Sequence, residues 1–440
     1  MRTLAMSCAG VSLGCPVYGP PPGATALDAR FRLIQLLANR EPTCSLPQPF
    51  YGDADFHQLD LDLIWNRNWL FAGPECTIPA SGNWFTMEVG TTSLAMVRGA
   101  DGAVRAFYNT CRHRGSKVCV GEHGKAAKLV CPYHQWTYDL DGRLLFARDM
   151  GAHFDPTQFP LKQAHCRTLG GYVYVCLADT APDFDAFAQM VEPYMLPHGL
   201  KGAKVAHTQT LIEKANWKLV IENNRECYHC SGSHPELLRT LSEYDSSDDP
   251  RVPKVFADRI RTKAAEWDRH GLPHMSQNSD DKRFRVVRLP LASGTSMTMD
   301  GSQAVKPLMG HLRDADLGSV RLLSLPNSWN HLQADHTVAF RVLPLGPRET
   351  MVTTWWLVNK DAQEGVDYDV GNLTRVWTAT NEQDRVLVEN NQAGINSKAY
   401  EPGPYSPHIE FGVQNFVDWY TGEMMAGLTT PMPKIMLRVA

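Results

Sequence analysis

The stretch that decides the fold is Cys111-Arg112-His113, followed after a gap by Cys131-Pro132-Tyr133-His134. Each half pairs one cysteine with one histidine, so together they offer two thiolates and two imidazoles. Two such pairs must come from two loops that hold one metal centre between them, and the tips of two β-hairpins provide such loops. Gly115 and Gly142 follow the two pairs and allow tight turns close to the sulfurs.

These ligands have the spacing of a Rieske [2Fe–2S] centre, in which two histidines replace two cysteines on one iron. Neutral imidazoles reduce the negative charge of the cluster and raise its potential to roughly −150 to +300 mV, so it accepts electrons easily from a reduced flavin or ferredoxin. A structural zinc site uses the same ligand types. Zinc fingers, however, place two cysteines before two histidines. We therefore predict a [2Fe–2S] cluster held by Cys111, His113, Cys131 and His134.

A second set of ligands lies in Glu226-Cys227-Tyr228-His229 and in His234. The two histidines are five residues apart, which would place them on different sides of an ideal helix. Ser231-Gly232-Ser233 provides a break, so a helix over 216–229 can end at His229 while His234 reaches back. Two histidines and one carboxylate form the facial triad of a mononuclear iron(II) site with positions open for O₂.

The third ligand should come from the helix expected over 368–390. Asp384 shares one face of this helix with residues at helical spacing, namely Trp377, Asn381 and Val388. Glu382 and Glu389 point away from this face and should be solvated. We therefore predict Asp384 as the third iron ligand.

Glu226 precedes His229 by three residues, so the two side chains would be neighbours on a helix. Spacing alone leaves an ordinary exposed acid as an equal alternative. The functional interpretation is a carboxylate that orients His229 and bridges to a cluster histidine.

Composition is that of an ordinary globular protein, with 440 residues, 43% hydrophobic and 20% charged. The net charge of −4 gives no reason to expect nucleic acid or a membrane as partner. Eleven cysteines are an odd number, which argues against a secreted disulfide framework and favours the cytoplasm. Residues 1–25 are a poor signal peptide and should form a disordered leader or an over-extended start.

The fold class expected is α+β, in three parts. Residues 1–60 should form the leader and an N-terminal helical segment, 61–185 a small all-β cluster domain, and 186–440 a catalytic domain with an antiparallel sheet and covering helices. Asp101-Gly102 and Asp141-Gly142 predict two hairpins. The other expected elements are helices at 27–39, 60–70 and 255–269 and strands at 170–177, 320–325, 337–343 and 350–358.

Together the motifs resemble the large subunits of the Rieske non-haem iron oxygenases. The resemblance is carried by the two Cys/His pairs, Asn216-Trp217-Lys218, His229 and His234. The longer stretches at 45–51, 223–237, 296–301 and 402–406 are similar to the glycine betaine monooxygenase branch of this family. The similarity runs from about residue 42 to about 425 and leaves out residues 1–25.

This resemblance implies a helix-grip catalytic domain and a head-to-tail homotrimer, in which the cluster of one subunit reduces the iron of its neighbour. It implies that Glu226 is the bridging acid, where ring-hydroxylating relatives usually carry aspartate. Electrons would come from NAD(P)H through a separate flavin and iron–sulfur reductase, with O₂ as co-substrate.

The expected activity is hydroxylation of an N-methyl group of a quaternary ammonium compound, most favourably glycine betaine, giving dimethylglycine and formaldehyde. Proline betaine or carnitine, an aromatic ring for dioxygenation, and a non-catalytic electron carrier are the alternatives. A permanent cation calls for aromatic faces. The candidates, for each of which core packing is the alternative, are Tyr228, Trp329, Trp355, Trp356 and Trp377.

Overall fold

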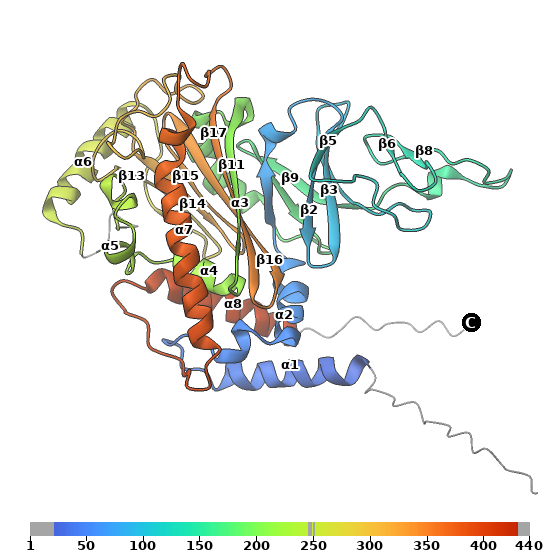
Figure 1. Ribbon diagram of the computed structural model, residues 1–440, viewed down its shortest axis with the longest axis horizontal. Coiled ribbons are helices and arrows are strands. Elements are labelled where there is room, and N and C mark those ends of the chain that lie inside the picture. The colour runs from blue at the N-terminus through green and yellow to red at the C-terminus, as the bar shows by residue number, and fades with distance from the viewer. Residues whose placement is uncertain (1–21, 245–248, 250, 430–440) are drawn as a thin grey trace, which may run out of the picture.

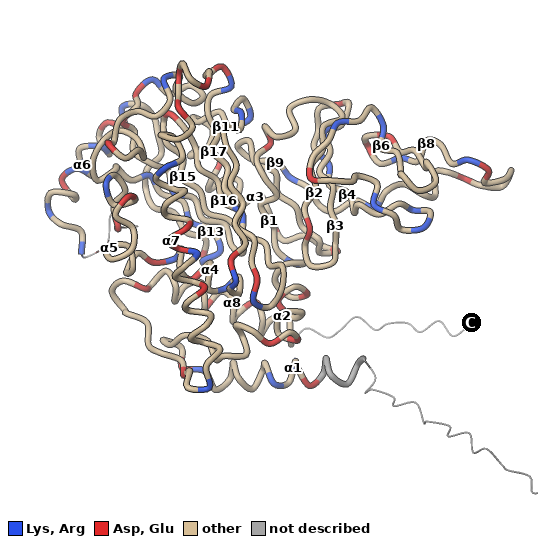
Figure 2. Tube along the Cα trace, viewed as in Figure 1, with Lys and Arg blue, Asp and Glu red and all other residues tan. Residues whose placement is uncertain are grey.

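The computed structural model describes residues 22–244, 249 and 251–429, with side chains described from residue 28 onward. Two β-rich bodies lie side by side, and the helices gather on the larger one (Figure 1). Lys and Arg are interspersed with Asp and Glu over both bodies (Figure 2). In the described part of the chain, no helix is long and apolar enough to cross a membrane. The expected leader falls outside these residues, except that 22–25 begin helix α1 (Pro22–Ala38).

The smaller body is all β, as expected. A seven-stranded antiparallel sheet has the order β1-β10-β9-β4-β3-β2-β5, and a three-stranded sheet, β6-β7-β8, projects from it. Both expected hairpins are present, joining β3 to β4 and β7 to β8. The strands are β1 (Leu70–Pro74), β2 (Asn83–Val89), β3 (Thr92–Arg98), β4 (Val104–Tyr108), β5 (His123–Lys125), β6 (Leu129–Val130), β7 (Thr137–Tyr138), β8 (Leu144–Phe146), β9 (Gln163–Leu169) and β10 (Tyr172–Cys176).

The larger body is built on one antiparallel sheet of order β11-β17-β16-β15-β14-β13-β12. The three expected strands of this region are confirmed as β14, β16 and β17. The other four strands of this sheet were not predicted, because their apolar runs are short or interrupted by polar residues. The strands are β11 (Ala203–Glu213), β12 (Gln277–Asn278), β13 (Phe284–Leu289), β14 (Ser319–Ser324), β15 (Ser328–Leu332), β16 (His336–Gly346) and β17 (Glu349–Asn359).

Helix α7 (Val370–Ile395) lies along this sheet (Figure 1). Asp384, the predicted third iron ligand, lies near the middle of this helix. Asn381 fixes the helix on the sheet, because its side-chain amide donates to Gln209 Oε1 of β11 at 2.8 Å and to Thr354 Oγ1 of β17 at 3.1 Å. The helix expected over 368–390 is thus confirmed. Helix α6 (Lys254–Arg269) lies at the outer edge of this body (Figure 1) and matches the expected helix over 255–269. Helix α3 (Asp185–Met195) packs instead in a core that includes strand residues of both bodies.

The N-terminal segment packs on the larger body and does not form a separate layer. Helix α2 (Ala54–Asp60) continues into a π-helical turn (Leu61–Trp65), so the helix expected over 60–70 was placed too late. It begins early because the Asp53 side chain accepts hydrogen bonds from two backbone N–H groups of the first turn. Residues of this segment share one core with α8 (Phe411–Thr429) near the C-terminus.

A buried ion pair joins these distant segments. Asp60 and Lys218 are both fully buried and in contact, and Lys218 belongs to helix α4 (Trp217–Asn224). The Asp60 carboxylate also accepts hydrogen bonds from Trp217 Nε1 at 3.0 Å and from the Tyr420 hydroxyl at 2.6 Å. One carboxylate therefore satisfies donors from α4 and α8 at once.

Replacing Asp60 with alanine should destabilise the protein by about 3–5 kcal/mol, because the variant leaves Lys218 buried without its counter-charge. Urea unfolding of the wild type and the variant measures the difference in the free energy of unfolding. Asp62→Ala is the matched control, since Asp62 lies in the next turn and is exposed. Equal stability of the two variants would show that the pair contributes nothing.

Candidate metal centres

Two loops of the smaller body carry the four predicted cluster ligands. Cys111 lies in a turn closed by a hydrogen bond from the Gly115 N–H to its carbonyl at 3.0 Å, and Cys131 lies in one closed by the Gln135 N–H at 2.9 Å. Gly115 and Gln135 both have positive φ, 82° and 61°. The second tight turn thus depends on Gln135. Gly142, which we had expected there, belongs to the β7–β8 hairpin instead.

The four side chains fit the predicted cluster. Cys111 and Cys131 are buried, and the rings of His113 and His134 are 4.6 Å apart. His113 stacks on Trp136, and its Nδ1 is buried with no hydrogen-bond partner among the described residues. Two buried thiols beside an unpartnered imidazole nitrogen form a metal-ligand set.

The candidate iron ligands in the larger body depend on the early end of α4. Helix α4 stops at Asn224, whereas the sequence predicted helix to His229. Arg225 caps it, and the chain then turns before a short helix α5 (Cys230–Ser233). His229 precedes α5 and His234 follows it, so the two histidines face each other across one short turn.

Three ligand atoms meet at this point. His229 Nε2 and His234 Nε2 are 2.9 Å apart, and Asp384 Oδ1 of α7 is 3.4 Å from the first and 3.0 Å from the second. Ligands at about 2.1 Å from one ion and at right angles to one another would be about 3.0 Å apart. The triangle therefore has the size of one face of an octahedral site, which is what a facial triad requires.

The other ring nitrogens of both histidines are held by neighbouring side chains. His229 Nδ1 lies 2.6 Å from Glu226 Oε1, so the expected contact between these residues is present even though the helix ends before them. His234 Nδ1 donates to Gln383 Oε1 at 2.8 Å, and the Gln383 amide donates to Glu236 Oε2 at 2.8 Å. Such contacts fix the tautomer and orientation of ligating imidazoles.

The electrostatics of the site favour a cation. Burial lowers the pKa of His229, but Asp384 and Glu226 outweigh burial and raise this pKa to about 9. Burial, and then the charge of Asp384, raise the pKa of Glu213 to about 8. Glu213 lines a small hollow behind Asp384, and its Oε2 has no hydrogen-bond partner within the described chain. An iron(II) ion would supply the positive charge that these carboxylates lack.

Cys227 and Cys230, which flank His229, are joined by a disulfide with a Cα–Cα distance of 5.0 Å. The sequence left their role open, and the odd cysteine count argued only against a framework of many bridges. This bridge closes the loop that carries His229. It therefore adds a covalent constraint to a ligand that is otherwise held by Glu226.

The five aromatic candidates for a substrate cage are divided by the structure. Trp377 lines the hollow at the iron ligands, and Trp329 lines the hollow behind Asp384. Trp355 and Trp356 are buried in the core around the sheet. Tyr228 is 60% exposed. Only Trp377 and Trp329 therefore lie where a cation near the iron would meet an aromatic face.

Several residues of the site were missed by the sequence reasoning. Gln383 lies next to Asp384 and Glu236 lies two residues after His234, so proximity in sequence was the only available signal. Arg321 and His331 line the same hollow from two strands of the sheet. No local pattern marks them, because their placement depends on strand pairing.

Comparison with known proteins shows the family of both parts of the chain. Residues 200–426 match the family described as ring hydroxylating alpha subunit (catalytic domain), and residues 68–160 match the Rieske [2Fe-2S] domain. The chain is 54% identical over 402 residues to the glycine betaine monooxygenase oxygenase subunit of Pseudomonas aeruginosa, covering 91% of this chain and 94% of that protein. The Chromohalobacter salexigens subunit of the same name is 51% identical over 416 residues, covering 94% and 93%.

A crystal structure of the quaternary ammonium Rieske monooxygenase CntA superposes with a TM-score of 0.68 at 19% identity, covering 89% of this chain and 98% of that one. At this level of identity the likeness shows the shared fold. The expected α+β architecture, a Rieske domain joined to a catalytic domain with an antiparallel sheet and covering helices, is thereby confirmed.

Proposed function

The chain belongs to the family of ring-hydroxylating oxygenase alpha subunits that carry a Rieske domain, and on this premise we propose that it hydroxylates an N-methyl group of glycine betaine. The products are dimethylglycine and formaldehyde. The observation that carries the proposal is the His229–His234–Asp384 triangle on a chain that also holds a Rieske ligand set. The similarity to two glycine betaine monooxygenase subunits over more than nine-tenths of the chain supports the substrate.

The chemistry of a quaternary ammonium explains why such an enzyme needs both centres. The nitrogen has no lone pair, so oxidation has to begin at a methyl C–H bond. An iron(II) ion held by His229, His234 and Asp384 would supply the O₂ activation that this insertion needs, with electrons from a cluster on the Cys/His pairs. The N-hydroxymethyl group then loses its hydroxyl proton and breaks its C–N bond, leaving as formaldehyde, and the nitrogen keeps the electron pair. O₂, two electrons and two protons balance one hydroxylation and one water.

The surrounding residues position the reactants. Glu226 and Gln383 hold the two histidines, which keeps one face of the site directed into the hollow. Trp377 presents an aromatic face to a cation in that hollow. The protein thus selects which methyl group approaches the open face.

Electron delivery is proposed to pass between subunits of a homotrimer. The region of the predicted cluster loops, around β6 and β8, and the region of the predicted iron ligands, around α5, lie on opposite sides of the molecule in Figure 1. A neighbouring subunit that places its cluster beside Glu226 would remove this separation. A separate flavin and iron–sulfur reductase supplies electrons from NAD(P)H, and we place the system in the cytoplasm.

Carnitine, proline betaine and aromatic rings remain the competing substrates. Glutamate at position 226 weighs against an aromatic ring, because ring-hydroxylating relatives usually carry aspartate there. The acidic surroundings of the iron ligands, with Glu226 and Asp384 in one hollow, also favour a cation over an apolar ring. Glycine betaine is therefore the first substrate to test.

Glycine betaine should give one formaldehyde and one dimethylglycine for each NADH oxidised when a competent reductase is added. The same assay with proline betaine, carnitine and choline ranks the alternatives, and naphthalene serves as the aromatic comparison. If every quaternary amine is inert while the cluster is reduced normally, the iron site stands and the substrate class is wrong.

A further inference from the structure

The hollow at the iron ligands adjoins a second hollow through a shared wall. Asn224, Arg321 and His331 line both of them. The first hollow also contains His229, His234 and Asp384, whereas the second runs between β13, β14 and β15. A small molecule bound at the iron would therefore meet this shared wall on one side.

The charge of the lining residues changes sign across the shared wall. The acidic residues that line the iron hollow are Glu226, Glu243 and Asp384. The second hollow has no acidic residue among its described lining and has three arginines, Arg225, Arg285 and Arg321. One end of this space thus suits a cation and the other an anion.

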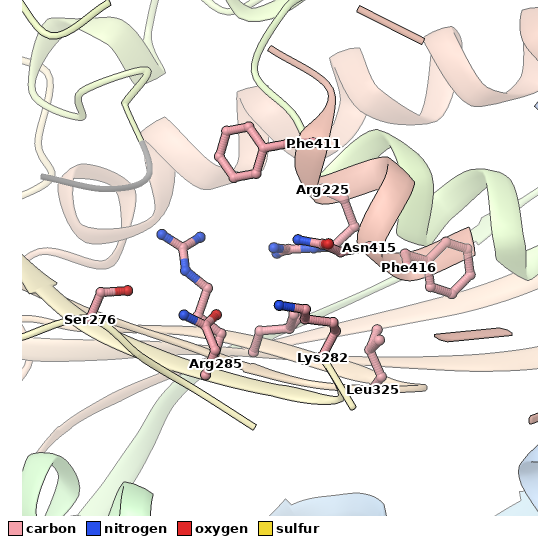
Figure 3. Close-up of a pocket in the computed structure, with 11 residues that line it drawn as sticks. Arg225, Ser276, Lys282, Arg285, Leu325, Phe411, Asn415 and Phe416 are labelled. Carbon is pink, nitrogen blue, oxygen red and sulfur yellow. The ribbon is translucent and has the colours of Figure 1, made fainter. Parts of the chain in front are cut away.

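Basic residues also line a third hollow next to the second one. A third hollow shares Arg225 and Arg285 with the second and adds Lys282. Figure 3 shows these three side chains directed into it from different segments of the chain. Basic side chains therefore line a continuous path from this third hollow to the shared wall.

Arg321 and His331 are paired on that wall by the sheet. They are direct partners in the β14–β15 register, so their side chains leave the sheet on the same face. Arg321 is anchored by donating through Nη1 to Tyr244 O at 2.8 Å and through Nη2 to Ser242 O at 3.0 Å. His331 is buried, and its ring lies 4.8 Å from that of Trp377.

We propose that Arg321, with His331 beside it, is the carboxylate subsite of this enzyme. The inference rests on the proposed function, because it assigns the orientation of a zwitterionic betaine. The quaternary nitrogen lies against Trp377 with one methyl group toward the triad, and the carboxylate lies against Arg321. In glycine betaine a single methylene separates the two charged groups. The shared wall is therefore the part of the basic path that its carboxylate meets, and Arg285 lies beyond it.

Two substitutions at one position test this subsite. Arg321→Gln and Arg321→Lys both lose the paired hydrogen bonds to Ser242 and Tyr244, but only the lysine keeps the positive charge. Dissociation constants are measured by anaerobic calorimetry on protein loaded with cluster and iron. The ligands are glycine betaine and tetramethylammonium, which has the cationic head and no carboxylate.

For glycine betaine, Arg321→Gln should raise the dissociation constant at least about tenfold and Arg321→Lys by no more than about threefold. Tetramethylammonium should change by less than about twofold in both variants, because it makes no contact through a carboxylate. Arg285→Gln is the matched control, and it should shift glycine betaine by less than about threefold.

Three results would overturn the subsite. The first is an unchanged dissociation constant for glycine betaine in Arg321→Gln. The second is an equal rise in the dissociation constants of both ligands in the two Arg321 variants. The third is a wild-type protein that binds tetramethylammonium as tightly as glycine betaine. A wild-type protein that is loaded with iron and binds neither ligand is a different result. It would reject the proposed substrate class, and the subsite with it.

Discussion

Asp384→Ala should lower the iron content from about three atoms per chain to about two, because the cluster keeps two and the mononuclear site loses its carboxylate. Two neutral histidines alone provide no negative charge to balance Fe(II). Formaldehyde release should fall by more than the roughly 10–100-fold that follows loss of an outer-shell partner. Iron analysis together with the visible spectrum of the cluster separates the two centres.

The matched control is Glu382→Ala on the same helix. Glu382 forms an ion pair with Arg385 at 2.9 Å, and its side chain is 45% exposed. Its loss should leave both the iron content and turnover near the wild-type values. If Asp384→Ala keeps three irons and its activity, Asp384 is not a ligand, and Glu213 in the adjoining hollow becomes the next carboxylate to test.

Glu226→Gln should leave both metal centres bound and block the passage of electrons between them. The amide keeps the size of the side chain but cannot hold His229 Nδ1 through a charged hydrogen bond. In a single turnover with reduced cluster, substrate and O₂, the rate of cluster reoxidation should fall by about 100-fold, at the upper end of the range for such partners. Stopped-flow absorbance follows the cluster directly.

Glu243→Gln controls for the loss of a negative charge in the same hollow. Within the described part of the chain, Glu243 makes no hydrogen bond or ion pair with His229, so cluster reoxidation should remain within about twofold of the wild type. Normal reoxidation in Glu226→Gln would contradict the bridging role. Loss of mononuclear iron in that variant would show that Glu226 is needed for binding the metal and would leave electron passage to another route.

The residues brought together at the metal centres could be selected from the sequence because their spacing is local. The Cys/His pairs lie in two short turns, and one face of a helix was enough to choose Asp384. The position of a helix end was harder. The predicted helix over 216–229 is longer than the observed one, because α4 ends at Asn224 with Arg225 as its C-cap. No residue type in 225–229 indicates that the helix ends there.

Features that depend on contacts between distant segments could not be predicted from the sequence. Trp355 and Trp356 are neighbours in sequence, yet they pack into two different core clusters, and Trp377 shares the second cluster while also lining the iron hollow. The packing of α7 on the sheet decides where Trp377 lies, and strand register decides that Arg321 lies beside His331. The N-terminal helices likewise contain no motif that predicts packing against α8.

The Asp60–Lys218 pair also has a consequence for the order in which the protein can be assembled. Asp60 precedes the predicted cluster domain in the chain and Lys218 follows it, so this domain is inserted between two segments that meet in one core. During synthesis, the ion pair can therefore form only after the whole insertion and α4 have emerged from the ribosome.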